Sequence, residues 1–218
     1  MTPEPSWEED FNDWYDREHI PLRMAVPGFL SAQRYRAPDT RHYLAVYEMA
    51  SADVLKSPVY QAVRNAPSER TRRMLGGVQG FTRYLAAPIA EHTGPSAAGD
   101  RLDAPFVYAV FFAVPVDREA EFNDWYGLDH TPLLLECTDW LWVRRFRIAD
   151  GEPAGWTHLT LHYLSHLRSL ESPERARARA TPWRARLAQE AWFKGAYQVF
   201  QKRGPRQLAA TGIGARRL

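Results

Sequence analysis

FNDWYDREHIPL, from Phe11 to Leu22, returns as FNDWYGLDHTPL from Phe122 to Leu133. Extending the comparison without a gap to Arg36 and Arg147 gives 11 identical residues in 26 aligned positions, which indicates an internal duplication. The repeat unit is about half of the 218-residue chain and is therefore too long to be a solenoid module. We predict two copies of one small domain, fused in tandem, that pack against each other as a built-in dimer.

The bulk composition excludes several classes of protein. The net charge is +2, and no acidic or basic tail points to a nucleic-acid partner or a membrane surface. The one local excess of charge is RARARATPWRAR at residues 175–186, whose spacing is typical of the solvated face of a helix. The only cysteine, Cys137, excludes an intrachain disulfide, and we interpret it as a buried apolar thiol rather than a nucleophile. No stretch is apolar enough to span a membrane, so we expect a cytoplasmic protein.

The second copy has the pattern of a β-α-β-β-α-β unit, with both helices on one face of the sheet. The apolar run at Phe106–Val114 predicts a buried strand, and an amphipathic helix is expected from Asp117 to about His130. That helix should end there because Pro132 disfavours helical geometry at the residue before it. The remaining strands are expected at Trp140–Ile148, Trp156–Leu164 and Phe193–Gln201, with a second helix that starts near His166 and breaks near Pro182.

The first copy follows the same order but lacks its opening strand. Its elements are expected to be a helix at Trp7–Glu18, strands at Gly28–Arg36 and Tyr43–Met49, a helix from Ala52, and a last strand at Val78–Ala86. Two alternatives are a truncated start and a three-stranded half with an exposed edge, and we favour the truncated start. We predict an N-terminal repeat at residues 1–88, a linker rich in Pro, Gly and Ala at 89–104, a C-terminal repeat at 105–203, and a mobile tail at 204–218.

The duplicated helix carries an amide, a phenol and an imidazole along one stripe in both copies. They recur at the helical spacing i, i+3, i+7 and are Asn12, Tyr15 and His19 in the first copy and Asn123, Tyr126 and His130 in the second. The stripe ends at the imidazole, where the helix is expected to meet the rim of the sheet. An imidazole there can move a proton near neutral pH, with the tyrosine orienting it or a substrate. Alternatively, a histidine at a helix end donates to the last free carbonyl groups and is purely structural.

Two further histidines lie on a predicted strand, in WTHLTLHYL at residues 156–164. On a helix their spacing would form a metal ridge, but the alternation of polar and apolar residues favours a strand. On a strand, His158 and His162 are too far apart to share one ion easily, so we expect them to line a pocket. Aligning the two copies matches His42 with His158 and Val46 with His162.

The segments FNDWYDREHIPLRMAVPGFLSAQRYR (residues 11–36) and HYLAVYEM (residues 42–49) resemble the dimeric α/β-barrel superfamily, and most closely its EthD-like members. The resemblance covers both halves, and its W-Y-x-x-x-H-x-P string is more specific for the fold than for a reaction. It implies an α+β fold in which tandem ferredoxin-like (βαββαβ) repeats form an intrachain dimeric α/β barrel, with a pocket in each unit. Enzymes of the superfamily often use a pocket histidine as acid or base, which carries over to His19 and His130.

Members of the superfamily include cofactor-free monooxygenases, isomerases, cyclases and haem enzymes, so the resemblance implies a small-molecule enzyme. We expect proton-transfer chemistry of the lyase, isomerase or cyclase type, without cofactor or metal, on an aromatic, polyketide-like or lactone substrate. His130 is the better candidate for acid or base, with Tyr126 and Asn123 assisting, because the incomplete first copy leaves His19 in doubt. The alternatives are a non-catalytic module for an apolar ligand, a cofactor-free monooxygenase and a haem-binding relative. The expected substrate-binding residues are Tyr15, Asn12, Trp140, Trp142, Tyr108, Phe112, His158 and His162. The expected partner is a small apolar or aromatic molecule, and neither a nucleic acid nor a membrane is expected. The chain is expected to form an intrachain pseudo-dimer, and a homodimer of such chains is a further alternative.

Overall fold

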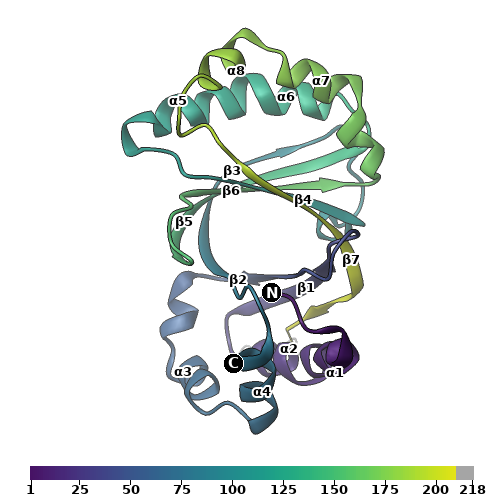
Figure 1. Cartoon of the computed structure of the whole chain (residues 1–218), viewed down its shortest axis with the longest axis vertical. Helices are drawn as coiled ribbons and strands as arrows, with labels where there is room; N and C mark the ends of the chain where they lie inside the picture. The colour runs from purple at the N-terminus through teal and green to yellow at the C-terminus, as the bar shows by residue number, and fades with distance from the viewer. Residues whose placement is uncertain (210–218) are drawn as a thin grey trace, which may run out of the picture. The chain divides into compact units, whose positions relative to one another are not determined.

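The computed structural model describes residues 1–209, and the chain divides into two compact units. The first comprises Met1–Phe81 together with the chain from Arg203 onward, and the second comprises Thr82–Lys202. Each unit combines antiparallel strands with helices that pack on one face of them, so the expected α+β class is confirmed (Figure 1). None of the helices in the described residues reaches the length and hydrophobicity that a membrane span requires.

After β3 (Arg83–Thr93), which opens the second unit, the chain has the predicted β-α-β-β-α-β order. The sheet of this unit contains β3, β4 (Phe106–Phe112), β5 (Trp140–Glu152), β6 (His158–Leu164) and the first part of β7 (Ala196–Leu208), in the order β7-β4-β6-β5-β3. One face is covered by α5 (Glu119–Asp124), the π-helical turn η6 (Trp125–His130), α6 (Thr131–Leu135), α7 (Pro173–Arg179) and α8 (Pro182–Leu187) (Figure 1). Short 3-10 turns lie at Arg101–Asp103, Val116–Arg118 and Leu167–Glu171.

The first unit has the same plan with fewer strands. Its order is β2-β1-β7, where β1 spans Phe29–Arg36, β2 spans Tyr43–Met49, and β7 contributes its end from Arg203. Its helices are α1 (Glu8–Trp14), the π-helical turn η2 (Tyr15–His19), α2 (Ile20–Met24), α3 (Pro58–Asn65) and α4 (Glu69–Gly77), with 3-10 turns at Pro5–Trp7 and Ala52–Lys56. No strand precedes α1 within residues 1–209, as the sequence predicts.

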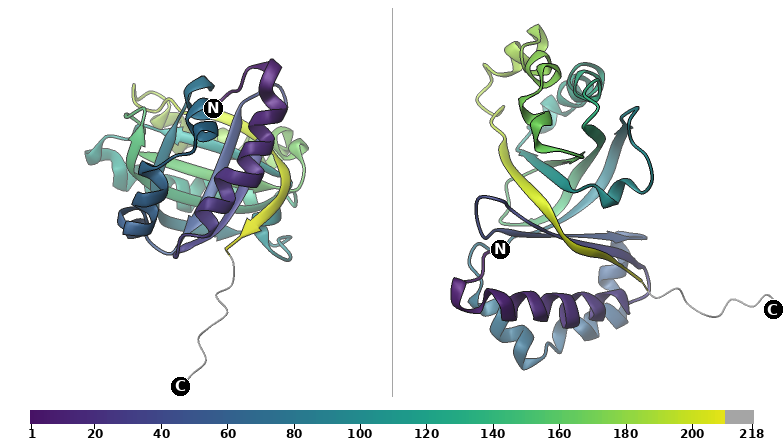
Figure 2. Two further views of the ribbon diagram at one scale, coloured as in Figure 1. Left: turned by 90° about the horizontal axis from the view of Figure 1, so that it is seen from below. Right: turned by 90° about the vertical axis from the view of Figure 1, so that its right-hand side faces the viewer.

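The first helix of each repeat continues through its proline, so the expected helix end is wrong. In the π-helical turns, the N–H of Ile20 donates to the carbonyl of Tyr15, and the N–H of Thr131 donates to that of Tyr126, five residues back. In an α-helix the proline that follows would clash with the carbonyl four residues before it, and the wider turn relieves that clash. The histidines at the ends of these turns therefore lie inside one long helix, which runs unbroken along the first unit in Figure 2.

The last strand of each repeat runs further than predicted. Strand β3 extends through Pro88 into the expected linker, because it is the edge strand of its sheet and its pairing with β5 shifts register beside that proline. Strand β7 continues through Gly204, whose φ is +66°, so residues 204–208 of the predicted mobile tail are strand. Residues 210–218 lie outside the described residues. The compact units consequently divide the chain at different places from the predicted repeats.

A buried arginine joins the first helix to the sheet in the second unit. Nη2 of Arg145 donates to Oδ1 of Asn123 at 2.6 Å, and its guanidinium carbon lies 4.4 Å from the ring centre of Tyr126. Arg145 is 3% exposed, and this burial lowers the pKa of its guanidinium to about 10. The amide of Asn123 is thus occupied in holding a strand against a helix.

The first unit contains the same contact. Nη2 of Arg34 donates to Oδ1 of Asn12 at 2.7 Å, and the guanidinium carbon lies 4.4 Å from the ring centre of Tyr15. Arg34 also forms an ion pair with Asp16 at 2.7 Å. Gly127 occupies the position of Asp16 in the second repeat, so the second arginine lacks this carboxylate.

Removing the amide that holds Arg145 should destabilise the protein. We expect Asn123→Ala to lower the free energy of unfolding by about 2–4 kcal/mol, because it leaves Nη2 of the buried guanidinium without its side-chain acceptor and only the longer bond from Nη1 to the backbone carbonyl of residue 123 remains. Asn65→Ala, at the exposed end of α3, should change it by less than about 0.5 kcal/mol. Urea unfolding followed by tryptophan fluorescence measures both, and equal stabilities of the two variants would contradict the proposed contribution of the contact.

Candidate functional site

A cavity of about 300 Å³ lies inside the second unit, between the helix-covered face of its sheet and the helices. Its walls come from β4, β5, β6, η6, α6, α7 and α8 and from the start of β7. Most of the lining is aromatic, with two histidines and three arginines among the rings. Six of the predicted site residues line it: Tyr108, Phe112, Tyr126, His130, Trp140 and His162.

The alternation of side chains along each strand explains this selection. Tyr108, Val110 and Phe112 are two residues apart on β4 and all face the helices. On β5 the register shifts between Trp140 and Trp142, so the two tryptophans do not share a face. Trp140 enters the core under the helices, whereas Trp142, a predicted substrate contact, does not line the cavity.

Trp142 instead packs on another group of residues. Its ring lies 5.0 Å from that of Tyr163, and the guanidinium carbons of Arg101 and Arg144 lie 4.7 and 4.8 Å from it. One neighbouring ring and two guanidinium groups therefore account for its burial.

His162 is held in one tautomer by a tryptophan. The indole Nε1–H of Trp140 can only donate, and it donates to Nδ1 of His162 at 3.1 Å. Neutral His162 therefore carries its proton on Nε2 and donates it to the hydroxyl oxygen of Tyr126 at 2.9 Å. Burial holds the pKa of His162 well below its usual value, and protonation would also break the bond from Trp140. His162 is thus neutral, and both of its ring nitrogens are occupied by hydrogen bonds.

The Tyr126 hydroxyl is left with its own hydrogen to donate. Its oxygen accepts from His162, and the hydroxyl of Thr160 also lies within hydrogen-bonding reach, so the phenolic hydrogen can be donated to Thr160 or to a bound ligand. Burial raises the pKa of Tyr126 above its ordinary value, which keeps the phenol protonated. The cavity therefore contains a fixed, uncharged hydrogen-bond donor.

His130 differs from Tyr126 in that it offers an acceptor, the lone pair on Nε2, rather than a donor. Its Nδ1 donates to the carbonyl oxygen of Ala178 at 3.1 Å, so in the neutral ring Nε2 is the basic atom. The ring stacks on Trp125, with centres 4.7 Å apart and planes at 27°. The pKa of His130 is lowered to about 4, chiefly by burial; the bond to the Ala178 carbonyl opposes this effect, and the charges of the neighbouring arginines add to it. His130 is therefore neutral at pH 7 and able to accept a proton.

Two other predicted residues lie outside the cavity. Asn123 holds Arg145, as described above. His158 packs against the ring of Phe122 at 5.3 Å, and its Nδ1 lies 2.9 Å from the hydroxyl of Thr157. The cysteine, Cys137, belongs to the hydrophobic core of the unit and does not line the cavity.

Three arginines also line the cavity, although the sequence predicts a solvated helix face for them. Arg175 and Arg179 lie one helical turn apart on α7, and Arg184 lies on α8. The arginine-rich run was expected to be a solvated face. The i, i+4 spacing of Arg175 and Arg179 indicates that they share one side of a helix. It does not indicate whether that side faces the sheet or the solvent, because this depends on tertiary packing.

The corresponding place in the first unit has different side chains. The two buried arginines fix the comparison: Arg34 on β1 pairs with Ala45 on β2, and Arg145 on β5 pairs with Thr160 on β6. Two residues further along, β2 has Tyr47 where β6 has His162. The expected match of His162 with Val46 is therefore wrong by one residue, because the alignment had no strand register to guide it.

The first unit therefore lacks the polar chain that fixes Tyr126. Phe29 has the repeat position of Trp140 and cannot donate a hydrogen bond. Tyr47 lies beside Tyr15 there. His19 is 6% exposed and packs on Trp14 and Tyr15, with ring centres 4.5 and 4.6 Å away, and its Nδ1 has no partner in the described residues.

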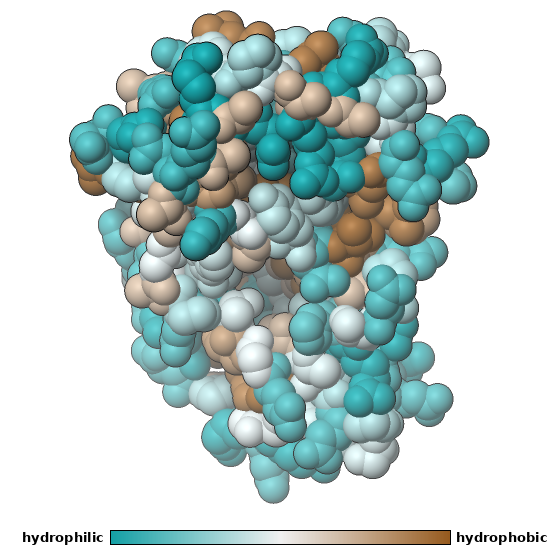
Figure 3. All heavy atoms as spheres, turned by 45° about the horizontal axis from the view of Figure 1, so that its top comes forward, coloured by the Kyte–Doolittle hydropathy of each residue, from teal (hydrophilic) through white to brown (hydrophobic). Residues whose placement is uncertain are grey.

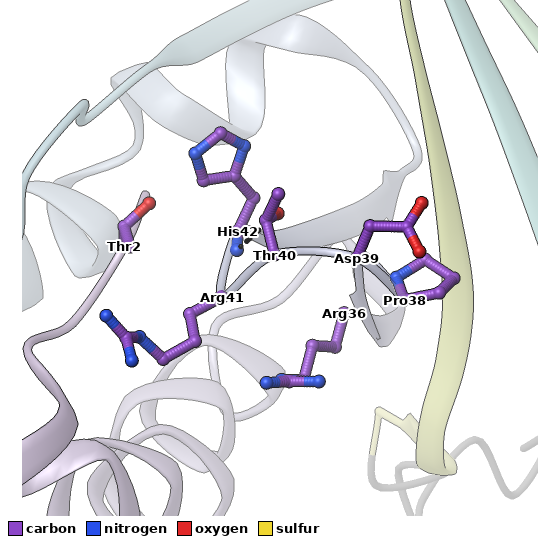
Figure 4. Close-up of a pocket in the computed structure, with 7 residues that line it drawn as sticks. All are labelled: Thr2, Arg36, Pro38, Asp39, Thr40, Arg41 and His42. Atoms are coloured by element: carbon purple, nitrogen blue, oxygen red, sulfur yellow. Dashed lines mark hydrogen bonds between the residues drawn. The ribbon is translucent and has the colours of Figure 1, made fainter.

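A second hollow, of about 480 Å³, lies at the turn between β1 and β2 (Figure 4). Its lining includes Arg36, Asp39, Arg41 and His42, and most of these side chains are exposed. No aromatic wall or buried polar group accompanies them, so it is a surface hollow of the turn. Within residues 1–209, no cluster of three His, Cys, Asp or Glu side chains is arranged to hold a metal ion.

The lowered pKa of His130 predicts a pH dependence of stability. A folded-state pKa of about 4 against an ordinary 6.5 means that neutral His130 stabilises the fold above pH 6.5, and that this contribution is lost as the pH falls toward 4. The free energy of unfolding should therefore fall more steeply in the wild type than in His130→Gln, by up to about 1.36 kcal/mol per pH unit over that window. Denaturant unfolding at a series of pH values measures the difference, and parallel curves would contradict it.

No protein-family model and no curated protein matches the chain. Among solved structures, an anthrone oxidase-like protein matches with a TM-score of 0.72 and 12% identity, over 99% of this chain and 92% of its own. A candidate monooxygenase from Fusobacterium nucleatum matches with a TM-score of 0.54 and 9% identity, over 94% and 88%. One from Lactobacillus acidophilus matches with a TM-score of 0.53 and 9% identity, over 89% and 88%. At these identities the likeness concerns the fold alone, and it agrees with the α+β fold class that the sequence predicts.

Proposed function

We propose that the second unit is an enzyme that binds a flat aromatic ketone or phenol and removes a proton from it, with Nε2 of His130 as the base. The observation that carries the proposal is the bond from Nδ1 of His130 to Ala178, which leaves a basic nitrogen on a neutral ring at an aromatic cavity. Proton transfer of this kind needs no redox group, which agrees with the expectation of cofactor-independent chemistry.

Tyr126 supplies the complementary group. Removing a proton next to a carbonyl places negative charge on the carbonyl oxygen, and a fixed donor stabilises that charge. The hydroxyl of Tyr126 is such a donor, because His162 occupies its oxygen and Trp140 fixes His162. In this proposal Tyr126 touches the substrate, and the other two are positioning residues.

The cavity walls favour an aromatic substrate. Tyr108 and Tyr197 stack with their planes at 11° and ring centres 6.0 Å apart, and Phe112 and Phe193 lie 5.2 Å apart. A volume of about 300 Å³ lies at the small end of ligand sites, which suits a molecule of two or three fused rings.

The neighbours of the fold suggest a second step after proton removal. One is anthrone oxidase-like, and two are candidate monooxygenases, which favours reaction of the carbanion with dioxygen over simple reprotonation. With anthrone, the methylene carbon would lose both hydrogens, one oxygen atom would become its new carbonyl, and the other would leave as water. Reprotonation elsewhere on the ring system would instead make the protein an isomerase.

The proposal predicts that His130 is required for proton transfer from anthrone. Without oxygen, the wild type should accelerate exchange of the anthrone methylene hydrogens with solvent deuterium above the buffer rate, and His130→Gln should lose at least about 100-fold of that rate. NMR follows the exchange, and ultraviolet absorption follows anthraquinone formation in air.

Two histidine variants serve as controls. His42→Gln, on an exposed turn, should exchange as the wild type does, and so should His19→Gln if the second unit carries the activity. Wild-type rates in His130→Gln would remove its role as base. Binding of anthrone with no acceleration of exchange would favour a non-catalytic binding module.

A second variant tests the positioning of Tyr126. Trp140→Phe removes the donor to His162, and the phenylalanine is compatible with the fold because Phe29 occupies this position in the first unit. We expect kcat to fall about 10-fold with little change in KM, since the donor acts on developing charge. Nitrogen-15 NMR should show His162 leaving its single tautomer. A normal kcat alongside a lost tautomer preference would contradict the positioning role.

A further inference from the structure

One wall of the cavity concentrates positive charge that no carboxylate balances. Arg175, Arg179 and Arg184 all line it, and within residues 1–209 none of the three forms an ion pair with an Asp or Glu side chain. Strongly hydrophilic side chains gather over the helices of the second unit in Figure 3. Like charges held together without a counterion repel one another, so the arrangement favours an anion.

The other arginine of α7, Arg177, is ion-paired. Arg177, between the two cavity arginines of α7, places Nη2 at 2.6 Å from Glu136 and 3.8 Å from Glu174. The alternating sequence of α7 thus separates an ion-paired outer arginine from two unbalanced ones at the cavity.

Arg175 and Arg184 each have N–H groups that their hydrogen bonds to backbone carbonyls do not use. Nη1 of Arg184 donates to the carbonyl of Arg179 at 3.2 Å, and Nη1 of Arg175 donates to the carbonyl of Leu170 at 2.5 Å. Each guanidinium has five N–H groups, so most remain for a ligand, and the planar fork matches the two oxygens of a carboxylate. Burial, followed by the charges of Arg179 and Arg175, lowers the pKa of Arg184 from its usual value.

Aromatic rings adjoin these cations. The guanidinium carbon of Arg175 lies 5.9 Å from the ring centre of Tyr108, and that of Arg184 lies 5.9 Å from the ring centre of Phe193. A ligand that meets the arginines with one end therefore meets flat apolar walls with the other.

We propose that the cavity selects an aromatic carboxylate, whose carboxylate group binds Arg175, Arg179 and Arg184 while its ring lies among Tyr108, Phe193 and the base His130. The inference names the substrate class of the proposed function and rests on it only for the orientation of the ring toward His130.

The bound anion would also change the base. The three arginines help to lower the pKa of His130, so a carboxylate placed among them offsets their effect and raises that pKa toward neutrality. A weak base in the empty cavity thereby becomes a better one when the correct ligand is present.

Paired probes that differ in charge test the inference. Isothermal titration calorimetry on the whole protein compares 2-naphthoate with its neutral analogue 2-naphthamide, and quenching of tryptophan fluorescence gives a second measure because Trp125 and Trp140 line the cavity. We expect the wild type to prefer the anion by about 10-fold or more at low salt. Arg175→Gln and Arg184→Gln should each reduce this preference, and the double variant, which keeps only Arg179, should reduce it further. Arg177→Gln, whose side chain bonds to Glu136, should keep it.

Each result decides for or against the inference. Equal affinities for the two probes, no binding of either at millimolar concentration, or an equal loss in Arg177→Gln would overturn it. His130→Gln should still prefer naphthoate, so a failure of the proposed catalysis would leave the charge preference intact. Conversely, normal exchange of anthrone by a protein that ignores probe charge would refute the anion site alone.

Discussion

The contact between a buried arginine, an asparagine and a tyrosine fixes how the long helix of each unit lies on its sheet. In the second unit, Arg145 extends from β5 to the amide of Asn123, and its guanidinium packs on the ring of Tyr126. A guanidinium removed from water is costly unless its donors and charge are satisfied, so the helix cannot slide or rotate without losing that compensation. The position of Tyr126 over His162, and of His130 one turn later, follows from this constraint.

The two units share one arrangement of helix and sheet but differ in the polar side chains that face the helix. Both keep the arginine, the asparagine and the π-helical turn, and in both the rings of the helix pack on the sheet. The second unit has Trp140 and His162 where the first has Phe29 and Tyr47, and only the former pair forms a chain of bonds that orients a phenol. Structural similarity between the units is therefore compatible with chemistry in one of them.

Much of this was predictable from the chain, because the duplication and the strand alternation depend on local sequence. The i, i+3, i+7 stripe indicated Tyr126 and His130, and the strand pattern indicated Tyr108, Phe112, Trp140 and His162, all of which line the cavity. The stripe also implicated Asn123, but its amide is taken by an arginine 22 residues away, which a helical pattern does not reveal.

Other features required three-dimensional information. Proline was expected to end the helix, because the rule for the preceding residue assumes α-helical geometry and not a wider turn. A bulge in β5 separates Trp142 from Trp140, and the cavity arginines depend on which side of α7 packs inward. The π-helical turn stands at the same place in both repeats, and inheritance accounts for that more simply than two separate origins. The wider turn was thus already present in the repeat before it was duplicated, whereas the differences between Trp140 and Phe29 and between His162 and Tyr47 arose afterwards.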